Sequence, residues 1–235
     1  MPSSTSFPSS FTRRRFLTAA AVGAGSMLAS GCTTRRVPPP EPEPVAPMGF
    51  AAMYGEKVDG GFVVPAIPIN KVDPRFFRQV VRDPTGERPG TVVVDTAGHH
   101  LYLVRENGEA LRYGVGLGRQ GFEWSGRAVI QWKQHWPKWT PPAEMIARQP
   151  ELEKYSAENG GMPGGLDNPL GARALYIFQN GEDTLYRVHG SPEWWTIGSS
   201  VSSGCVRMMN QDVIDLYDRV PNQTPIVVVQ GGYSV

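Results

Sequence analysis

Apolar and polar positions alternate from residue 91 onward, and this period of two predicts a series of short β-strands. Turn signals such as Thr96-Ala97-Gly98 and Asn107-Gly108 separate the first strands. Four strands joined by short turns favour an antiparallel sheet or a small barrel. The expected strands are residues 91–95, 100–104, 110–116, 127–133, 174–178, 185–189 and 225–229.

Helical segments are expected to be few and short. Residues 143–148 and 151–157 are predicted helices inside a long excursion between the fourth and fifth strands, and residues 211–217 form a third before the last strand. Gly160–Gly165 and Asp167–Gly171 are loops of that excursion, and long loops inside a compact domain are often functional. The fold class predicted is mainly β, a sandwich or barrel with a few short helices and long active-site loops.

The first 47 residues are interpreted as an export signal and a spacer. Thr12–Leu17 matches the twin-arginine export pattern, and a moderately apolar stretch follows it. Ala29-Ser30-Gly31-Cys32 resembles the lipobox of bacterial lipoproteins, which implies that Cys32 becomes lipidated, and ordinary cleavage nearby is the alternative. Residues 33–47 are proline-rich and behave as an extended tether that cannot bury a core.

The domain boundaries expected from this pattern are 1–32 for the export signal, 33–47 for the linker, 48–88 for a lead-in segment and 89–231 for the folded domain. The lead-in has residues 74–81 as either a short helix or an extended segment. The residues directly after Cys32 are not acidic, which by the general lipoprotein sorting pattern favours the outer membrane. We therefore expect a periplasmic protein held to a membrane by a lipid anchor.

Composition narrows the classes of partner. The chain has 235 residues, 40% of them hydrophobic, and a net charge of +1, so nothing in the charge balance favours a nucleic acid as partner. No apolar run reaches the length that spans a membrane. The histidines at 99, 100 and 135 lack metal-ligand spacing, so neither a metal site nor a cofactor is expected.

Candidate chemistry centres on Cys205, which lies sixteen positions after His189. The chain has two cysteines, and the export signal accounts for Cys32, so a structural disulfide is not expected. A thiol becomes a nucleophile when a base or a positive charge stands near it. The alternative is that Cys205 is a small buried hydrophobe and His189 a satisfied polar residue at a strand end.

The glycines beside this pair suit a catalytic arrangement. Gly190 would allow a sharp exit from the strand that His189 ends, and would let its own carbonyl approach the imidazole. If His189 Nδ1–H donates to that carbonyl, Nε2 is left to accept the thiol proton. Gly204 permits a tight turn whose backbone N–H groups, including that of Cys205, would stabilise an oxyanion, an effect worth a few kcal/mol.

Other residues near this pair are candidates for binding substrate. Arg207 is placed to bind a substrate carboxylate with both guanidinium nitrogens. Trp194 and Trp195, in the loop between His189 and Cys205, and Trp139 could line a substrate wall, although core packing explains each tryptophan equally well.

The sequence resembles the L,D-transpeptidase catalytic domain (YkuD-like) family over about residues 89–230. The resemblance rests on several motifs in the family's order. These are Gly114-Val115-Gly116, Trp139-Thr140-Pro141-Pro142, Gly164-Gly165, Asn168-Pro169-Leu170-Gly171, His189-Gly190, Ser202-Ser203-Gly204-Cys205-Val206-Arg207-Met208, Asn210 and Asp212.

This resemblance implies an L,D-transpeptidase-like fold and a cysteine acyl-enzyme that acts on peptidoglycan stem peptides. Cys205 would attack the bond after the third residue of a tetrapeptide stem and release D-alanine, with His189 as base. The acyl acceptor would be the diamino acid of another stem or a lysine of an envelope protein. Asn210 is then expected to help bind substrate, and carbapenem-type β-lactams are expected to acylate the same thiol.

Two positions depart from the family pattern. Many members have histidine immediately before the Gly-Cys pair, where this chain has Ser203, so Ser203 can serve only as a hydrogen-bonding group and His189 is the one candidate base of the motif. Residues 122–126 replace the Thr-Pro-x-Gly turn of many members, which could reshape the substrate entrance.

Two other functions remain open. An L,D-carboxypeptidase or amidase would use the same pair with water as the acceptor. A non-catalytic lipoprotein that binds peptidoglycan would need a buried Cys205 or a His189 that points away.

Overall fold

The computed structural model describes residues 47–118, 125–202 and 204–233. The export signal, the lipidation of Cys32, nearly all of the linker, Ser203 and most of residues 122–126 lie outside these residues and stay predictions. No helix of the described part has both the length and the apolar character that crossing a bilayer requires.

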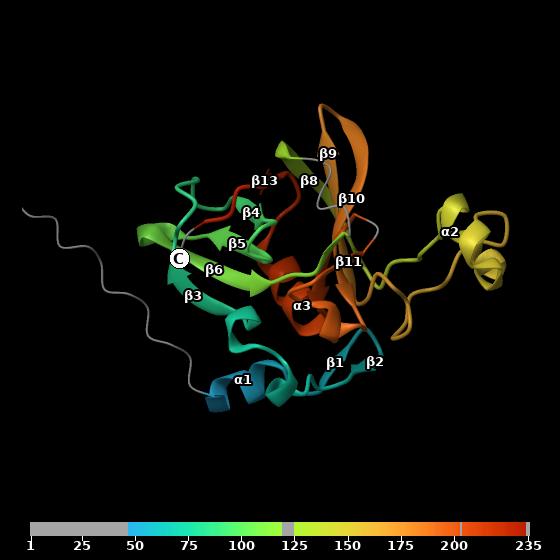
Figure 1. Ribbon diagram of the computed structural model, residues 1–235, viewed down its shortest axis with the longest axis horizontal. Coiled ribbons are helices and arrows are strands. Elements are labelled where there is room, and N and C mark those ends of the chain that lie inside the picture. Colours follow the sequence, from blue (N-terminus) through green and yellow to red (C-terminus); the bar gives the residue numbers. More distant parts are fainter. Residues whose placement is uncertain (1–46, 119–124, 203, 234–235) are drawn as a thin grey trace, which may run out of the picture. The chain divides into compact units, whose positions relative to one another are not determined.

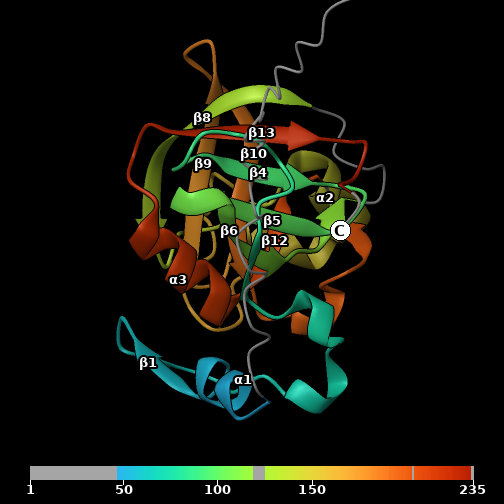
Figure 2. The same ribbon diagram turned by 90° about the vertical axis from the view of Figure 1, so that its left-hand side faces the viewer.

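Nine of the described strands form one sheet in the order β12-β10-β9-β8-β13-β4-β5-β6-β3, and β1-β2 and β11-β7 form two small separate pairs (Figures 1 and 2). Neighbours are antiparallel except for two parallel pairs, β10 with β12 and β13 with β4. The predicted mainly β class is confirmed. The strands are β3 (Gln79–Arg82), β4 (Val92–Asp95), β5 (His100–Val104), β6 (Glu109–Gly114), β8 (Gly126–His135), β9 (Arg173–Gln179), β10 (Glu182–Ser191), β12 (Val206–Met209) and β13 (Thr224–Val229).

The sheet curls until its β12 end meets the segment that follows β6. Gly116 and Arg207 exchange two backbone hydrogen bonds of 2.9 and 2.8 Å, which join these distant parts. Figure 2 shows β9 and β10 running across the direction of β4 and β5. Apolar side chains from one face of eight of these strands, together with Val213 and Leu216 of helix α3 (Asn210–Arg219), fill the enclosed core.

Short elements complete the described chain. The predicted helix 143–148 is present as α2, and 211–217 lies within α3, whereas 151–157 is a tighter 3₁₀ turn that begins at a proline. The remaining elements are α1 (Pro47–Met53), β1 (Lys57–Asp59), β2 (Phe62–Val64), η1 (Ile69–Lys71), η2 (Pro74–Phe76), η3 (Glu106–Gly108), β7 (Leu117–Gly118), α2 (Ala143–Arg148), η4 (Pro150–Tyr155), η5 (Trp194–Thr196) and β11 (Ser200–Ser202).

The lead-in segment is built into the sheet. Its strand β3 pairs with β6, so the sheet extends past the boundary expected at residue 89. Phe76 and Phe77 of the lead-in pack with Ile197 and Met209 in a second apolar cluster. Asp59 of β1 forms an ion pair with Arg173 of β9.

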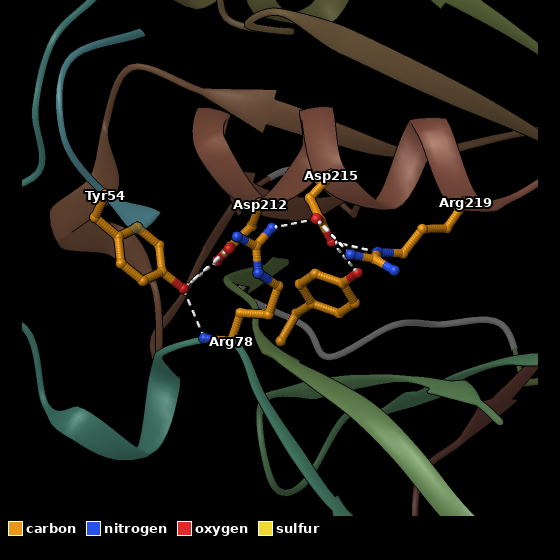
Figure 3. Close-up of polar contacts among 6 residues, drawn as sticks. Tyr54, Arg78, Asp212, Asp215 and Arg219 are labelled. Atoms are coloured by element: carbon orange, nitrogen blue, oxygen red, sulfur yellow. Dashed lines mark hydrogen bonds and ion pairs between the residues drawn. The ribbon is translucent and has the colours of Figure 1, made fainter. Parts of the chain in front are cut away.

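A polar network also ties the lead-in to α3 (Figure 3). The Tyr54 hydroxyl donates to the Asp212 carboxylate, with O–O distances of 2.9 and 3.1 Å, and accepts from the backbone N–H of Arg78 at 2.6 Å. The Arg78 guanidinium lies 2.8 Å from the Asp215 carboxylate, which also forms an ion pair with Arg219. Burial raises the pKa of Asp212 to about 7, and the nearby charge of Arg78 and the Tyr54 hydroxyl offset only part of that rise.

Asp212→Asn is expected to flatten the pH dependence of stability between about pH 4 and pH 7. The folded-state pKa of Asp212 lies above its ordinary value of 3.8, so its contribution is fully present below pH 4 and is lost as pH rises through 7. The loss is on the order of a few kcal/mol. Urea unfolding of both proteins at pH 4.5 and 7.5 measures it, and equal pH slopes for the two would contradict the assignment.

Candidate active site

His189 and Cys205 lie on adjacent parallel strands at one edge of the sheet. His189 of β10 is the register partner of Arg207 of β12, and Cys205 stands one residue before β12 begins. Alternate residues of a strand share a face. The side chains of His189, Arg207 and Cys205 therefore belong to the face opposite Val188 and Val206, which point into the core.

His189 is buried and oriented by its own neighbour. Its Nδ1 lies 2.6 Å from the Gly190 carbonyl oxygen, so Nδ1–H is the donor and Nε2 is left as an acceptor. Burial lowers the pKa of His189 to about 4, the Gly190 bond raises it in part, and the charges of Arg207 and Arg187 lower it further. The imidazole is therefore neutral near pH 7 and able to accept a proton.

Cys205 is present as a thiol and is half-buried. Burial raises its pKa above the ordinary value of 9.0, while a hydrogen bond from the backbone N–H of Arg187 and the charges of Arg187 and Arg207 lower it in part. The thiol with its raised pKa and the imidazole with its lowered pKa, on one face of adjacent strands, are both neutral at rest. The thiolate would then form during attack, by proton transfer to the base.

Glycine is required directly after His189 and directly before Cys205, for different reasons. Gly204 has φ of 126°, and a Cβ there would also stand 3.0 Å from the Tyr186 ring. Gly190 was expected to end the strand, but β10 continues through Ser191, so that expectation is wrong. A Cβ at Gly190 would instead collide with the Asn210 carboxamide oxygen and lie 3.1 Å from the Ala172 nitrogen. Close packing is the reason for this glycine.

Arg207 contacts an internal carboxylate. Its Nη1 lies 2.6 Å from Glu193 Oε2, in the loop between His189 and Cys205. The expected contact of Arg207 with a substrate carboxylate would compete with this ion pair. Glu193 was missed because no periodic pattern links it to Arg207.

Asn210 and Trp139 are placed as scaffold residues. The buried Asn210 accepts the backbone N–H of Ala172 at 2.9 Å, which differs from the expected substrate contact and fixes the chain beside Gly190. Trp139 is half-buried and exchanges backbone hydrogen bonds of 2.9 and 2.7 Å with Met162, which close the base of the excursion.

Trp194 and Trp195 lie in the catalytic loop with edge-to-face rings 5.6 Å apart. Trp194 packs against the second apolar cluster, whereas Trp195 is 62% exposed. With Lys71 and Phe76, both line a small hollow against the lead-in segment. The exposed Trp195 ring is therefore available to contact a substrate.

Arg187 is a second residue that sequence reasoning missed. It stands two positions before His189, so strand alternation alone could have placed both side chains on one face.

No group of three or more His, Cys, Asp or Glu side chains within the described part of the chain has the spacing to hold a metal ion.

Comparisons with known proteins agree on one family. A family model described as the L,D-transpeptidase catalytic domain matches residues 89–228, more than half of the chain. Probable L,D-transpeptidase ErfK/SrfK of Escherichia coli is 30% identical over 213 residues, which cover 87% of this chain and 65% of that protein. Probable L,D-transpeptidase YbiS of Escherichia coli is 32% identical over 144 residues, or 57% of this chain and 43% of that protein.

A solved structure from Brucella melitensis, described as a probable carnitine operon oxidoreductase, is 46% identical and covers 72% of this chain and 98% of that chain, with a TM-score of 0.46. That description refers to the Brucella protein, and the TM-score gives the likeness no weight here. The chain spans slightly less than two thirds of the ErfK/SrfK length.

Proposed function

The chain belongs to the L,D-transpeptidase catalytic domain family, and from this premise we propose that it is an exported cysteine acyltransferase of peptidoglycan. Its donor substrate would be a tetrapeptide stem, and its acceptor an amine of another stem or of an envelope protein. The proposal includes a periplasmic location and a lipid anchor at Cys32. The hydrogen bond from His189 to Gly190 carries the proposal, because it leaves Nε2 as acceptor on the face that Cys205 shares.

The reaction would proceed in two halves. Cys205 Sγ attacks the carbonyl of the third stem residue while its proton passes to His189 Nε2. Backbone N–H groups at the Gly204–Cys205 turn would stabilise the oxyanion. The tetrahedral adduct expels D-alanine, which takes the proton from His189, and a thioester remains. An amine then attacks the thioester, gives its proton to His189, and the sulfur leaves and regains a proton.

The test is a digest of muropeptides with the purified protein, followed by mass spectrometry. Crosslinked stem dimers together with released D-alanine support the proposal. Tripeptides alone would assign hydrolysis to the same pair, and no change in the stems would exclude both reactions. His189→Gln is compared with the wild-type protein and should lose both reactions, because the glutamine side chain is of similar size but does not act as a base.

Acylation is expected to persist in acid far below the ordinary pKa of histidine. Burial sets the pKa of His189 near 4 instead of 6.5, so the neutral base is lost only as pH falls through about 4. The rate of carbapenem acylation, followed by intact mass from pH 3.5 to 8 with circular dichroism as a folding check, measures this limb. An acid limb near pH 6.5 would contradict the lowered pKa of His189, and a limb that persists in His189→Gln would assign the base to another group.

A further inference from the structure

A row of side chains crosses three strands and ends at Cys205. Trp132 of β8 is the register partner of Tyr176 of β9, and Tyr176 is the partner of Arg187 of β10. The pairing of Val188 with Val206 places Arg187 level with Cys205, one step before β12 begins. The nucleophile therefore lies at the end of a continuous cross-strand row.

The rings of this row hold the Arg187 side chain from one side. The Trp132 and Tyr176 rings are stacked with centroids 3.5 Å apart and an interplanar angle of 9°. The Arg187 guanidinium carbon lies 4.4 Å from the Tyr176 centroid. A planar guanidinium stacks well on an aromatic face, which an ammonium does less well.

Asp183 holds the same guanidinium by a fork. Arg187 Nη1 and Nη2 donate to the two Asp183 oxygens at 2.7 and 2.8 Å, and Nη1 also reaches the Tyr186 carbonyl at 2.9 Å. The Arg187 side chain is only 14% exposed. The fork and the carbonyl contact together fix the orientation of this guanidinium.

The backbone is distorted so that this fork can form. Residues four apart in a regular strand are about 13 Å apart. A register shift between Asp183 and Arg187, with the exposed Leu185 at φ of 62°, shortens that separation. A branched apolar residue in the left-handed region is strained, and bulges beside active sites commonly redirect a side chain.

We propose that Arg187 is a positioning residue that supports the Cys205 thiolate from the neighbouring strand, with its guanidinium held in place by the Tyr176 ring and the Asp183 carboxylate. The backbone N–H of Arg187 already hydrogen-bonds to the sulfur, and the charge of Arg187 acts on both Cys205 and His189. The cation disfavours imidazolium and favours thiolate. It therefore keeps the resting base neutral and lowers the pKa of the thiol. This inference rests on the proposed nucleophile but not on the identity of its substrate.

The other charged groups near Cys205 come from the neighbouring elements. Arg207 of β12 also lowers the pKa of the thiol, but Glu193 neutralises part of its charge at 2.6 Å. His189 is neutral above about pH 4. The Asp183 carboxylate neutralises part of the charge of Arg187 in the same way.

The experiment is the pH profile of iodoacetamide alkylation, read on the peptide that contains Cys205 so that Cys32 does not contribute. Arg187→Gln is expected to raise the apparent pKa of the thiol by about one unit. Arg187→Lys keeps the charge but loses the fork and the stack, so a smaller upward shift is expected. Arg127→Gln is the matched control, because it removes an exposed arginine of β8 that pairs with Glu87, and its profile should coincide with wild type.

Tyr176→Leu provides a second route to the same answer if Arg187→Gln does not fold. Loss of the ring frees the guanidinium, and an upward shift smaller than that of Arg187→Gln is expected. A profile equal to wild type in either folded variant overturns the proposal. Alkylation needs no cell-wall substrate, so the two proposals can fail separately. A shifted profile without muropeptide turnover would support the role of Arg187 and contradict the transpeptidase activity. Muropeptide turnover with an unshifted profile would support the transpeptidase activity and contradict the role of Arg187.

Discussion

Cys205→Ala is expected to lower acyl transfer at least a thousandfold while the protein remains folded. The sulfur is the proposed nucleophile, and no other described side chain on its face can form a thioester. Removing the nucleophile of a covalent enzyme leaves only the rate that binding and oxyanion stabilisation supply. Val206 and Met208, which anchor this strand in the core, are untouched, so the loss should come from chemistry.

Carbapenem labelling measured by intact mass gives the direct readout for this prediction. Wild-type protein should gain one adduct and Cys205→Ala none, with muropeptide turnover lost in parallel. Cys32→Ala is the matched cysteine control and should retain both labelling and turnover in solution. Labelling or crosslinking that persists in Cys205→Ala would assign the nucleophile elsewhere.

The sequence was sufficient for elements whose pattern is local. Strand alternation located β4, β5, β9 and the later part of β10, and the proposed His189–Gly190 hydrogen bond involves adjacent residues and is present at 2.6 Å. The helix periodicity of α3 was also predictable, because its buried apolar residues Val213, Ile214 and Leu216 recur at helical spacing.

Features that depend on residues far apart in the chain could not be predicted from the sequence. The pairing of β3 with β6 is a tertiary choice, and so are the two parallel pairs of the sheet. Gly190 was taken for a turn because its crowding by Asn210 is invisible in the local pattern. The Leu185 bulge contradicts the local preference of leucine, so the Asp183–Arg187 fork that depends on it was hidden as well.

The ion pair between the lead-in and the sheet should be among the most costly contacts to break by one substitution. Arg173 and Asp59 share two contacts of 2.7 Å, with side chains only 3% and 13% exposed. The Trp136 indole N–H adds a third bond to Asp59 at 2.9 Å. Hydrogen bonding by Arg173 is the largest of the effects that lower the pKa of Asp59, against a rise from burial. Both charges are satisfied only while the lead-in stays docked.

Arg173→Met is therefore expected to lower the free energy of unfolding by about 2–4 kcal/mol, because it leaves the half-buried Asp59 carboxylate without its cation. Urea unfolding at pH 7 measures the loss, and Arg105→Met, which breaks an exposed pair with Glu109, should cost under about 1 kcal/mol. Asp59→Asn in the Arg173→Met background should recover part of the stability, since the unpaired charge is then gone.

The same ion pair predicts a pH dependence. The folded-state pKa of Asp59 is lowered, so its contribution to stability is present above the ordinary value of 3.8 and is lost as pH falls through the lower folded value. The gap between wild type and Arg173→Met should narrow in that acid range, and a gap below about 1 kcal/mol at pH 7 would mean that this ion pair does not stabilise the docking of the lead-in.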